Sequence, residues 1–437
     1  MQKKKGSAFI WLRNDLRIND HYALYHATQK YQRVVAYYSF DPALFKTTKW
    51  GFKKTERYRA QFLIESVLQL QKDLEKLNIT LIIEHRNPVE GIVQWIQKLN
   101  TTHLYFQSEW TSEERQQSEA IKKQIEDNIE IHQFYDQFLF HPNDIPIAVE
   151  DLPEVFTVFR KKCEKHGRVR LSLGVPSPME KTNLLNVPFK VPTLETLGLE
   201  SFEKHPHSAF PFEGGSAAAH QRLAHYFWKT KKLSFYKQTR NGLLGIDYSS
   251  KLSAWLANGS LSPREIYWAV RKYEKEVAKN QSTYWLIFEL IWRDYFKYIS
   301  LKHSDKIFHL GGILEKNYHW KNSQKAFRSW CEGTTAEPFV NANMIELNKT
   351  GWMSNRGRQN VGSFLAKNML LDWRMGAAHF ESMLIDYDVH SNYGNWMYVS
   401  GVGNDPRDRK FNVRWQAERY DTHGKFQQLW NQKTLFE

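Results

Sequence analysis

The chain lacks the features of several common protein classes. Only two cysteines, Cys163 and Cys331, occur among 437 residues, far apart and without a CxxC motif. This excludes a disulfide framework and a cysteine zinc site and indicates a reducing compartment. No uncharged segment approaches the length of a membrane-spanning helix. The apolar stretch 8–12 ends at Arg13 and is too short for a signal peptide, so we expect a soluble, cytoplasmic protein without membrane contact.

Sequence motifs of common enzyme classes are also missing. The N-terminal part contains neither GxGxxG nor GxxxxGK[ST], the usual fingerprints of dinucleotide and P-loop sites. HExxH, GxSxG and histidine/cysteine clusters do not occur, so we expect neither a metal site nor a serine nucleophile.

Proline is scarce outside one segment. Nine of the 14 prolines fall within residues 136–211, among them Pro176, Pro178, Pro188 and Pro192. Such a density prevents long helices and interior strands. We therefore predict that 136–211 is a connector on the surface between two domains.

Before this connector, short apolar segments alternate with longer amphipathic ones. Helices are predicted over 55–77 and 88–99, where apolar residues recur at three- and four-residue spacing. Strands are predicted over 8–13, 34–40, 79–85, 103–108 and 129–134. The alternation predicts an α/β domain (1–135) with a doubly wound, parallel five-stranded sheet, which would bind any ligand at its carboxyl edge.

From residue 212 to 437 the pattern is helical and predicts an all-α domain. Ser262 to Glu265 reads as an N-cap, a proline at the first helical position and a capping-box glutamate. The segment 282–300 is apolar on almost every face, so this helix should be buried. Within it, Glu289 and Arg293 share a face beside Trp292. They form either an internal salt bridge or a site in which Arg293 meets an anionic cofactor and Glu289 a bound base.

Aromatic and basic residues are abundant. Aromatic residues make up 15% of the chain, and 12 of the 16 tryptophans lie from Trp228 onward, most of them expected in a large core. A formal net charge of +14 and a pI near 9.4 favour a polyanionic partner, because cationic side chains displace counterions from phosphates.

Three further segments of the C-terminal half are rich in polar groups. The segment 352–360 combines two arginines, three amides and an indole, and the apolar residues after it indicate that part of it points inward. The segment 386–396 has the Asn, Gly, Ser and Asp content of a tight loop between helices. Tyr236, Arg240 and the run 249–253 supply donors that suit a pyrophosphate.

Taken in this order, the segments resemble the photolyase/cryptochrome family and its DASH branch in particular. Trp11 to Arg17 (WLRNDLR) is similar to the N-terminal strand signature of that family. The stretches 236–245, 282–293 and 352–360 are similar to DASH versions of its FAD-pocket motifs. The resemblance covers nearly the whole chain.

The resemblance implies a U-shaped FAD inside the helical domain. An amide at Asn392, beside the reactive flavin nitrogen, favours the fully reduced flavin. The FAD-binding residues that it implies are Tyr236, Ser249, Ser250, Lys251, Leu252, Ser253, Glu289, Arg293, Trp352, Asn355, Arg358, Asp386, Asp388 and Asn392. Trp396, Trp373 and Trp330 are the implied relay that carries electrons to the flavin.

By the same resemblance, the protein is a photolyase-type lyase, and we expect a monomer. Blue light excites the reduced flavin, an electron passes to the cyclobutane ring of a pyrimidine dimer, two carbon bonds break, and the electron returns. Glu289 would hold the flipped dimer. The residues implied in DNA binding are Arg240, Trp292, Arg356, Gln359, Tyr398 and Arg409.

Departures from the family pattern favour single-stranded DNA. Relatives that repair duplex DNA carry methionine and tryptophan where this chain has Gln359 and Tyr398. More polar side chains stack more weakly on a flipped base, so they should offset less of the free energy that flipping a base out of a duplex costs. No histidine lies within 352–360, which argues against (6-4) photoproduct repair.

Two further expectations follow from the resemblance. A second, antenna chromophore is expected, most commonly methenyltetrahydrofolate in the DASH branch, with Glu109 as its contact. The chain ends soon after Trp430, without the long tail of signalling cryptochromes. The alternative function is a blue-light photoreceptor with the same fold and flavin but no repair activity.

Overall fold

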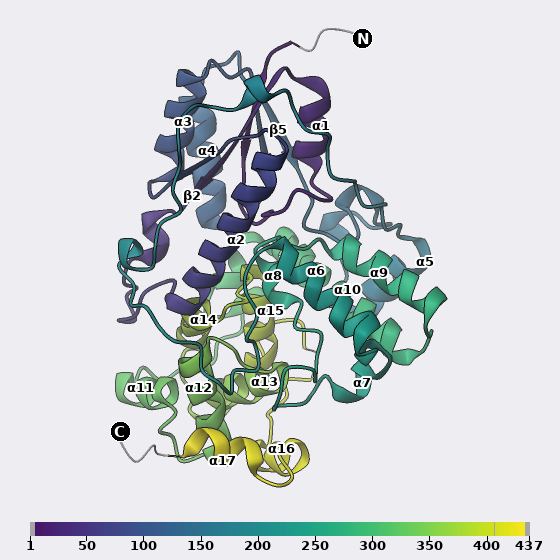
Figure 1. The fold of residues 1–437 in the computed structure, drawn as a ribbon. Coiled ribbons are helices and arrows are strands. Elements are labelled where there is room, and N and C mark those ends of the chain that lie inside the picture. The colour runs from purple at the N-terminus through teal and green to yellow at the C-terminus, as the bar shows by residue number, and fades with distance from the viewer. Residues whose placement is uncertain (1–4, 406, 433–437) are drawn as a thin grey trace.

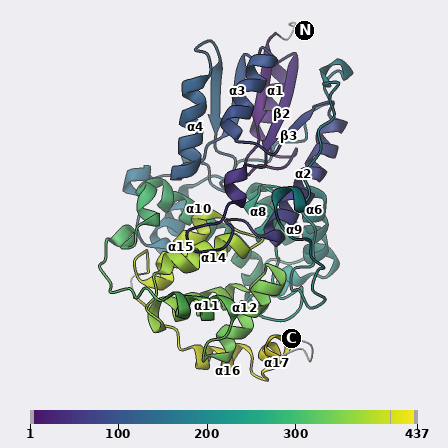
Figure 2. The ribbon, with the colours of Figure 1, turned by 90° about the vertical axis from the view of Figure 1, so that its left-hand side faces the viewer.

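The computed structural model describes residues 5–405 and 407–432 and consists of a sheet domain packed on a helical domain. In Figure 1 the sheet lies above the helices, and Figure 2 shows the same two layers from the side, with α10, α14 and α15 below the strands. The expected α/β plus all-α fold is confirmed.

Every strand pairing in the sheet is parallel, in the order β3-β2-β1-β4-β5. The strands are β1 (Ser7–Trp11), β2 (Arg33–Ser39), β3 (Leu81–Glu84), β4 (His103–Gln107) and β5 (Glu130–Phe134). All five expected strands form, and every observed strand end lies within two residues of its expected position.

Alternate side chains of the strands enter two separate cores, as a doubly wound sheet requires. Ile10 and Ala36 pack on one face with Leu24 of α1 and Ile64 of α2. Phe9, Tyr37 and Phe106 pack on the other face with α3 and α4. The helices of this domain are α1 (Tyr22–Lys30), α2 (Arg57–Lys76), α3 (Pro88–Lys98) and α4 (Ser112–Gln124).

The second domain is helical, and α10 is at its centre. Its helices are α6 (Ser216–Ala224), α7 (Tyr236–Thr239), α8 (Ser253–Ala257), α9 (Pro263–Glu276), α10 (Gln281–His303), α11 (Gln324–Glu332), α12 (Pro338–Thr350), α13 (Asn355–Ser363), α14 (Trp373–Met383), α15 (Val389–Ser400), α16 (Val413–Tyr420) and α17 (Lys425–Asn431). The expected capping box of α9 is present at Ser262 and Glu265.

Two local expectations need correction. The connector contains an eleven-residue helix, α5 (Phe156–His166), in the stretch between Pro153 and Pro176 that is free of proline. The segment 386–396, expected as a loop, is helical from Val389, and Asp388 caps it by accepting a hydrogen bond from the Ser391 amide at 2.8 Å.

Buried polar side chains join the two domains. Asp20, after β1, accepts hydrogen bonds from the Arg264 guanidinium at 2.8 Å and from the Ser262 hydroxyl. Arg264 also pairs with Asp136 at 3.0 Å. Arg17, from the WLRNDLR motif, is buried and donates to the carbonyl oxygens of Asp20 and Gly259. This motif therefore fastens the sheet domain to the helices.

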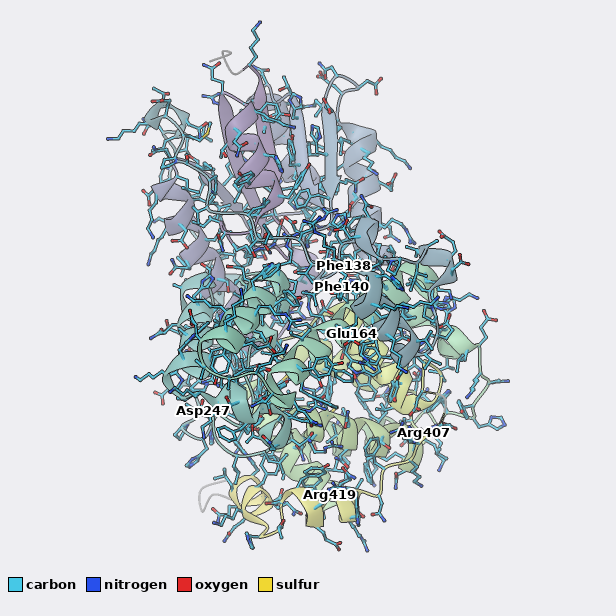
Figure 3. The ribbon with its side chains drawn as sticks, turned by 90° about the vertical axis from the view of Figure 1, so that its right-hand side faces the viewer. Phe138, Phe140, Glu164, Asp247, Arg407 and Arg419 are labelled. Carbon is cyan, nitrogen blue, oxygen red and sulfur yellow. The ribbon has the colours of Figure 1, made fainter. Side chains whose placement is uncertain are left out.

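The start of the connector is fixed to α10 in the same way. Asp294 accepts hydrogen bonds from the backbone amides of Leu139 (3.0 Å) and Phe140 (2.8 Å). Phe138 and Phe140 are buried there and lie between the two layers in Figure 3.

Candidate functional site

A cavity of about 90 Å³ lies between α13, α14 and α15. Its walls combine apolar groups, such as Phe380 and Val399, with polar ones. Seven residues expected from the sequence line it: Asn355, Arg358, Gln359, Asp386, Asp388, Asn392 and Trp396. Two separate motifs of the C-terminal half, 352–360 and 386–396, therefore converge on one place.

An ion pair crosses this cavity wall. Arg358 donates to Asp386 at 2.8 and 3.0 Å, and only 3% of the Asp386 side chain is exposed. The Arg358 guanidinium also lies 5.4 Å from the centre of the Trp352 ring. The pair fixes a cation at the wall that could hold an anionic or strongly polar group.

Charged groups without hydrogen-bond partners lie close to this pair. Lys251 Nζ is buried, 3.3 Å from the centre of the Tyr248 ring and 4.8 Å from that of Trp352. Burial lowers the pKa of Lys251 well below its ordinary value and raises the pKa of Glu346 to about 8. Lys251 Nζ and both Glu346 oxygens lack hydrogen-bond partners within the described part of the chain.

Asn392 and Asp388 reach the cavity from α15. The Asn392 amide nitrogen donates to the Ala377 carbonyl at 3.0 Å, which leaves its carbonyl oxygen for an occupant. Asp388 accepts from Lys297 at 2.8 Å, and this neighbour holds the pKa of Asp388 far below its usual range despite burial.

A larger cleft, of about 490 Å³, separates the carboxyl edge of the sheet from the helices. Arg13 and Asn14 follow β1 at its rim, and Glu109 follows β4. Arg293 lines this cleft and donates to the carbonyl of Leu256 at 3.2 Å, as well as to that of Gln137. Six of the fourteen expected flavin residues thus line the two cavities: Arg293 lines the cleft, Asp388 lines both, and the small cavity has Asn355, Arg358, Asp386 and Asn392.

Glu109 lies at the cleft in an ionised state. Burial alone would raise its pKa, but His390, Lys297 and Arg13 together lower it. Gln107 Nε2 donates to Glu109 at 2.9 Å. The sequence reasoning missed Lys297, a buried cation between Glu109 and Asp388, although it stands one helical turn after Arg293 on α10.

Glu289 does not pair with Arg293. Its carboxylate instead meets the guanidinium of Arg240, which follows α7, so the intrahelical salt bridge that we considered is absent. Burial raises the pKa of Glu289, and Arg240 opposes that shift. Both side chains are partly exposed, at 28% and 21%, so they form a polar rim that solvent reaches.

Arg356 and Gln359 continue this rim. Arg356 donates to the Gln359 oxygen at 3.0 Å and to Asn241 at 3.1 Å, next to Arg240 in the chain. Gln359 also lines the small cavity. The basic rim and the cavity are therefore contiguous.

An aromatic wall stands beside Glu289. Trp292, one turn further along α10, stacks on Phe156 of α5 with ring centres 3.6 Å apart. Tyr398 meets Trp292 edge-on at 6.1 Å. Because Phe156 covers one face of Trp292, only the other face can meet a base.

Several expected residues lie apart from these clusters. Among the described residues, neither Tyr236 nor any member of 249–253 lines the two cavities. The carbonyls of Ser249 and Ser250 accept hydrogen bonds from Arg222; Leu252 is buried and Ser253 is exposed. Arg409 is an exposed cation 3.4 Å from Asp405.

The three expected relay tryptophans are all buried. Trp396 lines the small cavity, and its ring centre lies 6.1 Å from that of Trp330. Gly376 of α14 lies against Trp396, where a Cβ atom would come within 2.2 Å of the ring, and Trp373 stands one turn earlier on α14. Trp330 and Trp373 are 0% exposed.

The polar residues present suit an FAD, of which the small cavity, at about 90 Å³, could hold only a part. Buried polar groups without partners are costly in a closed core. Lys251 and Glu346 are two such groups near Trp352, but neither lines the two cavities, and both pKa shifts favour the uncharged forms. FAD carries an anionic pyrophosphate. Arg358 suits such a group as a fixed cation, and Asn392 supplies an amide oxygen beside Trp396. No described helix has the length and apolar content needed to span a bilayer.

Comparison with known proteins agrees with this site. Residues 8–180 match the family model described as DNA photolyase, and residues 285–433 match the FAD binding domain of DNA photolyase. A Cryptochrome DASH of Gloeobacter violaceus is 45% identical over 97% of this chain and 85% of its own length. A Cryptochrome DASH of Xenopus laevis is 45% identical over 96% of this chain and 81% of its own length.

Solved structures give the same result. The Synechocystis cryptochrome structure superposes with a TM-score of 0.94 at 43% identity, over 98% of this chain and 89% of that one. The convergent polar cavity, the parallel sheet and these relatives lead to one conclusion: the chain belongs to the photolyase/cryptochrome family, among the DASH cryptochromes, and its helical domain is the FAD-binding domain of that family.

Proposed function

We propose that the protein repairs cyclobutane pyrimidine dimers with blue light, preferentially in single-stranded DNA. The observation that carries this proposal is the contiguity of the small cavity with the basic rim. Gln359 lines the cavity beside Asn392 and accepts a hydrogen bond from Arg356 on the rim. A base that enters from the rim would therefore meet the group held beside Asn392.

The chain would position the substrate, and the bound group would supply the redox chemistry. FAD in its reduced form supplies, under blue light, an electron that splits the cyclobutane ring and then returns. Arg240 and Arg356 attract backbone phosphates, which cationic side chains bind regardless of sequence. The Glu289 carboxylate, held by Arg240, can accept a hydrogen bond from a pyrimidine N–H.

The aromatic wall supports the preference for single strands. A flipped dimer would stack on Trp292 and Tyr398, and base–aromatic stacking contributes about 1–3 kcal/mol per base. One face of Trp292 is already covered by Phe156. With Tyr398 and Gln359 in place of larger apolar groups, this wall stabilises a flipped dimer too little to unpair a duplex readily.

The buried tryptophans suit electron supply to the flavin. Trp396 and Trp373 would be successive steps, with Trp330 edge-on against Trp396. A relay must also end where an external reductant reaches it, and none of these three is exposed. Trp320 is partly exposed, and Lys321 beside it bonds to the Leu370 carbonyl, three residues before Trp373. We infer that Trp320 is the surface end of the relay.

The interdomain cleft is the place for an antenna chromophore. Its volume of about 490 Å³ is that of a small-molecule site. Glu109 and Gln107 provide an anion and an amide at its wall. A folate such as methenyltetrahydrofolate carries N–H donors, and an ionised carboxylate can accept hydrogen bonds from them. An absorption spectrum of purified protein tests this assignment through a band in addition to that of flavin.

The test is repair of a defined substrate. Reduced holoprotein is incubated under blue light with dimer-containing oligothymidine, and regained absorbance at 260 nm measures repair. We expect repair in single strands and slower repair in the matching duplex. Failure to repair either substrate by a flavin-loaded protein would overturn the proposal in favour of the photoreceptor function.

Glu289→Gln tests the proposed substrate contact. The neutral amide lacks the negative charge that anchors Arg240. We therefore expect the repair rate to fall on the order of ten- to a hundredfold, the range for the loss of a hydrogen bond to a charged group. Flavin content should stay unchanged. The exposed acid Glu276, changed to Gln, is the matched control. Loss of FAD in Glu289→Gln would instead assign Glu289 to the cofactor.

A further inference from the structure

A cluster of three potential metal ligands lies at the amino end of the sheet, the end opposite the cleft. His103 is the first residue of β4, and Glu130 pairs with it across the strands as the first residue of β5. His132 stands two residues along β5, so its side chain falls on the same face as Glu130. The ligand atoms of the three side chains all lie within 4.8 Å of one another.

Each histidine lies near one oxygen of the Glu130 carboxylate, at a distance that two ligands of one ion can have. His103 Nε2 lies 3.4 Å from one Glu130 oxygen, and His132 Nε2 lies 3.3 Å from the other. A tetrahedral ion with bonds of about 2.0–2.1 Å to nitrogen and oxygen holds its ligand atoms roughly 3.3–3.4 Å apart. The rings of His103 and His132 are also stacked, with centres 5.6 Å apart, so both approach the carboxylate from one side.

Neighbouring hydrogen bonds leave His103 Nε2 without a proton in the neutral ring. The Thr102 hydroxyl donates its only hydrogen to the Ser7 carbonyl at 2.9 Å. The Thr102 oxygen lies 2.8 Å from His103 Nδ1, so in this hydrogen bond the ring N–H is the donor. In the neutral ring the lone pair of Nε2 consequently faces a carboxylate, and two acceptors at this distance repel unless a proton or a metal cation lies between them. Metal-binding histidines typically donate their other ring N–H to a neighbouring oxygen in this way.

His132 is in a similar position. Its Nε2 is buried and has no hydrogen-bond partner among the residues that the structure describes. Its ring stacks on Tyr105 of β4 at 4.2 Å, which fixes its orientation. Two held imidazoles thus point ring nitrogens at an anionic side chain whose exposure, 65%, lets it turn toward an ion.

We propose that His103, Glu130 and His132 bind one divalent transition-metal ion of the zinc class. Two imidazoles and a carboxylate are ligands that suit Zn²⁺ and its first-row neighbours rather than Mg²⁺ or Ca²⁺. The ion ties the edge strand β5 to β4, and water completes its coordination at this open end of the sheet. Because 27 residues separate His103 from Glu130, no ligand motif marks the site in the sequence.

Zinc titration of the FAD-loaded full chain without a histidine tag tests the proposal. After dialysis against a chelator, calorimetry with Zn²⁺ should show one equivalent bound and a raised midpoint of thermal unfolding. Glu130→Gln, at an exposed position, and His103→Gln should each weaken binding by at least about tenfold and abolish that shift. Unchanged flavin absorption and circular dichroism verify the fold of each variant.

His205 and His207 provide the matched control. These connector histidines also lie close together, with ring centres 5.8 Å apart, but outside the cluster. Zinc should bind the double variant His205→Gln/His207→Gln with unchanged affinity. The proposal is overturned if Glu130→Gln and His103→Gln bind Zn²⁺ as the parent protein does, or if the parent binds no stoichiometric Zn²⁺ at up to about 1 mM.

Discussion

Single buried residues of the helical domain show how strongly an apolar setting changes side-chain chemistry. His379 of α14 lies among Phe52, Phe327 and Trp330, and neither of its ring nitrogens has a hydrogen-bond partner in the described structure. Burial lowers the pKa of His379 to about 4. The folded protein therefore keeps this ring neutral where an unfolded chain would protonate it.

His379 should make the protein sensitive to acid. Its contribution to stability is complete above the unfolded pKa of 6.5 and is lost as the pH falls toward 4, because only the unfolded chain takes up the proton. At about 1.4 kcal/mol per pKa unit, this amounts to about 3 kcal/mol. We expect His379→Leu to flatten the decline of unfolding free energy between pH 6.5 and 4.

Urea unfolding at several pH values measures this slope. The exposed His207, changed to Leu, is the control and should leave the slope as it is. A slope in His379→Leu equal to that of the parent protein would show that the acid sensitivity has another origin.

At the scale of elements, the sequence predicted what local patterns encode. The spacing of apolar residues and the local composition were sufficient to predict the five strands, the helix α10 and the cap of α9. The helix α15 was missed because its Asn, Ser and Gly residues are typical of loops, and packing against α10 and α14 overrides that local preference.

The site was predictable in part for the same reason. The motif resemblance predicted that Arg358, Asp386 and Asn392 belong to one site, and the structure brings them to one cavity. It could not give the partner of Glu289, since Arg240 is 49 residues distant and meets it only through tertiary packing. Trp320, likewise, differs from the three buried tryptophans Trp330, Trp373 and Trp396 by its partial exposure, which no local pattern reveals.

Helix caps allow a comparison of two serines. Ser323 caps α11 by accepting from the Ala326 amide, and its loss to alanine should cost about 1 kcal/mol. Ser262 caps α9 and also donates to Asp20 in the interdomain joint. We expect Ser262→Ala to cost roughly 1–3 kcal/mol more, because a buried carboxylate loses a donor. Thermal unfolding of both variants measures the difference, and equal losses would mean that the bond to Asp20 contributes nothing.

At the scale of the whole molecule, the joint makes the two domains one structural unit. Arg264 bonds to Asp20 and Asp136, and all three side chains are at most 5% exposed. Long helix α2 strengthens the contact, since Arg59 donates to the Glu381 carbonyl at 2.6 Å. The cleft between the domains should therefore keep its width, with no hinge.

Arg264→Met should separate the unfolding of the two domains. Removing one partner of a buried ion network costs about 3–5 kcal/mol, because two carboxylates stay buried without a counterion. We expect calorimetry to show a lower first transition, with the sheet domain melting apart from the flavin-loaded helices. Lys272→Met, at an exposed ion pair, is the control. A single transition at the parent temperature would show that the network is dispensable.

The position of the joint in the chain has a consequence for synthesis on the ribosome. Asp20 is translated more than 240 residues before Ser262, which donates a hydrogen bond to its carboxylate, and Arg264, which neutralises its charge. Until those residues leave the exit tunnel, the loop after β1 cannot bury its carboxylate without a large desolvation penalty. The nascent sheet can form first, but this loop should stay open until α9 emerges, so docking of the domains is expected to be a late step of folding.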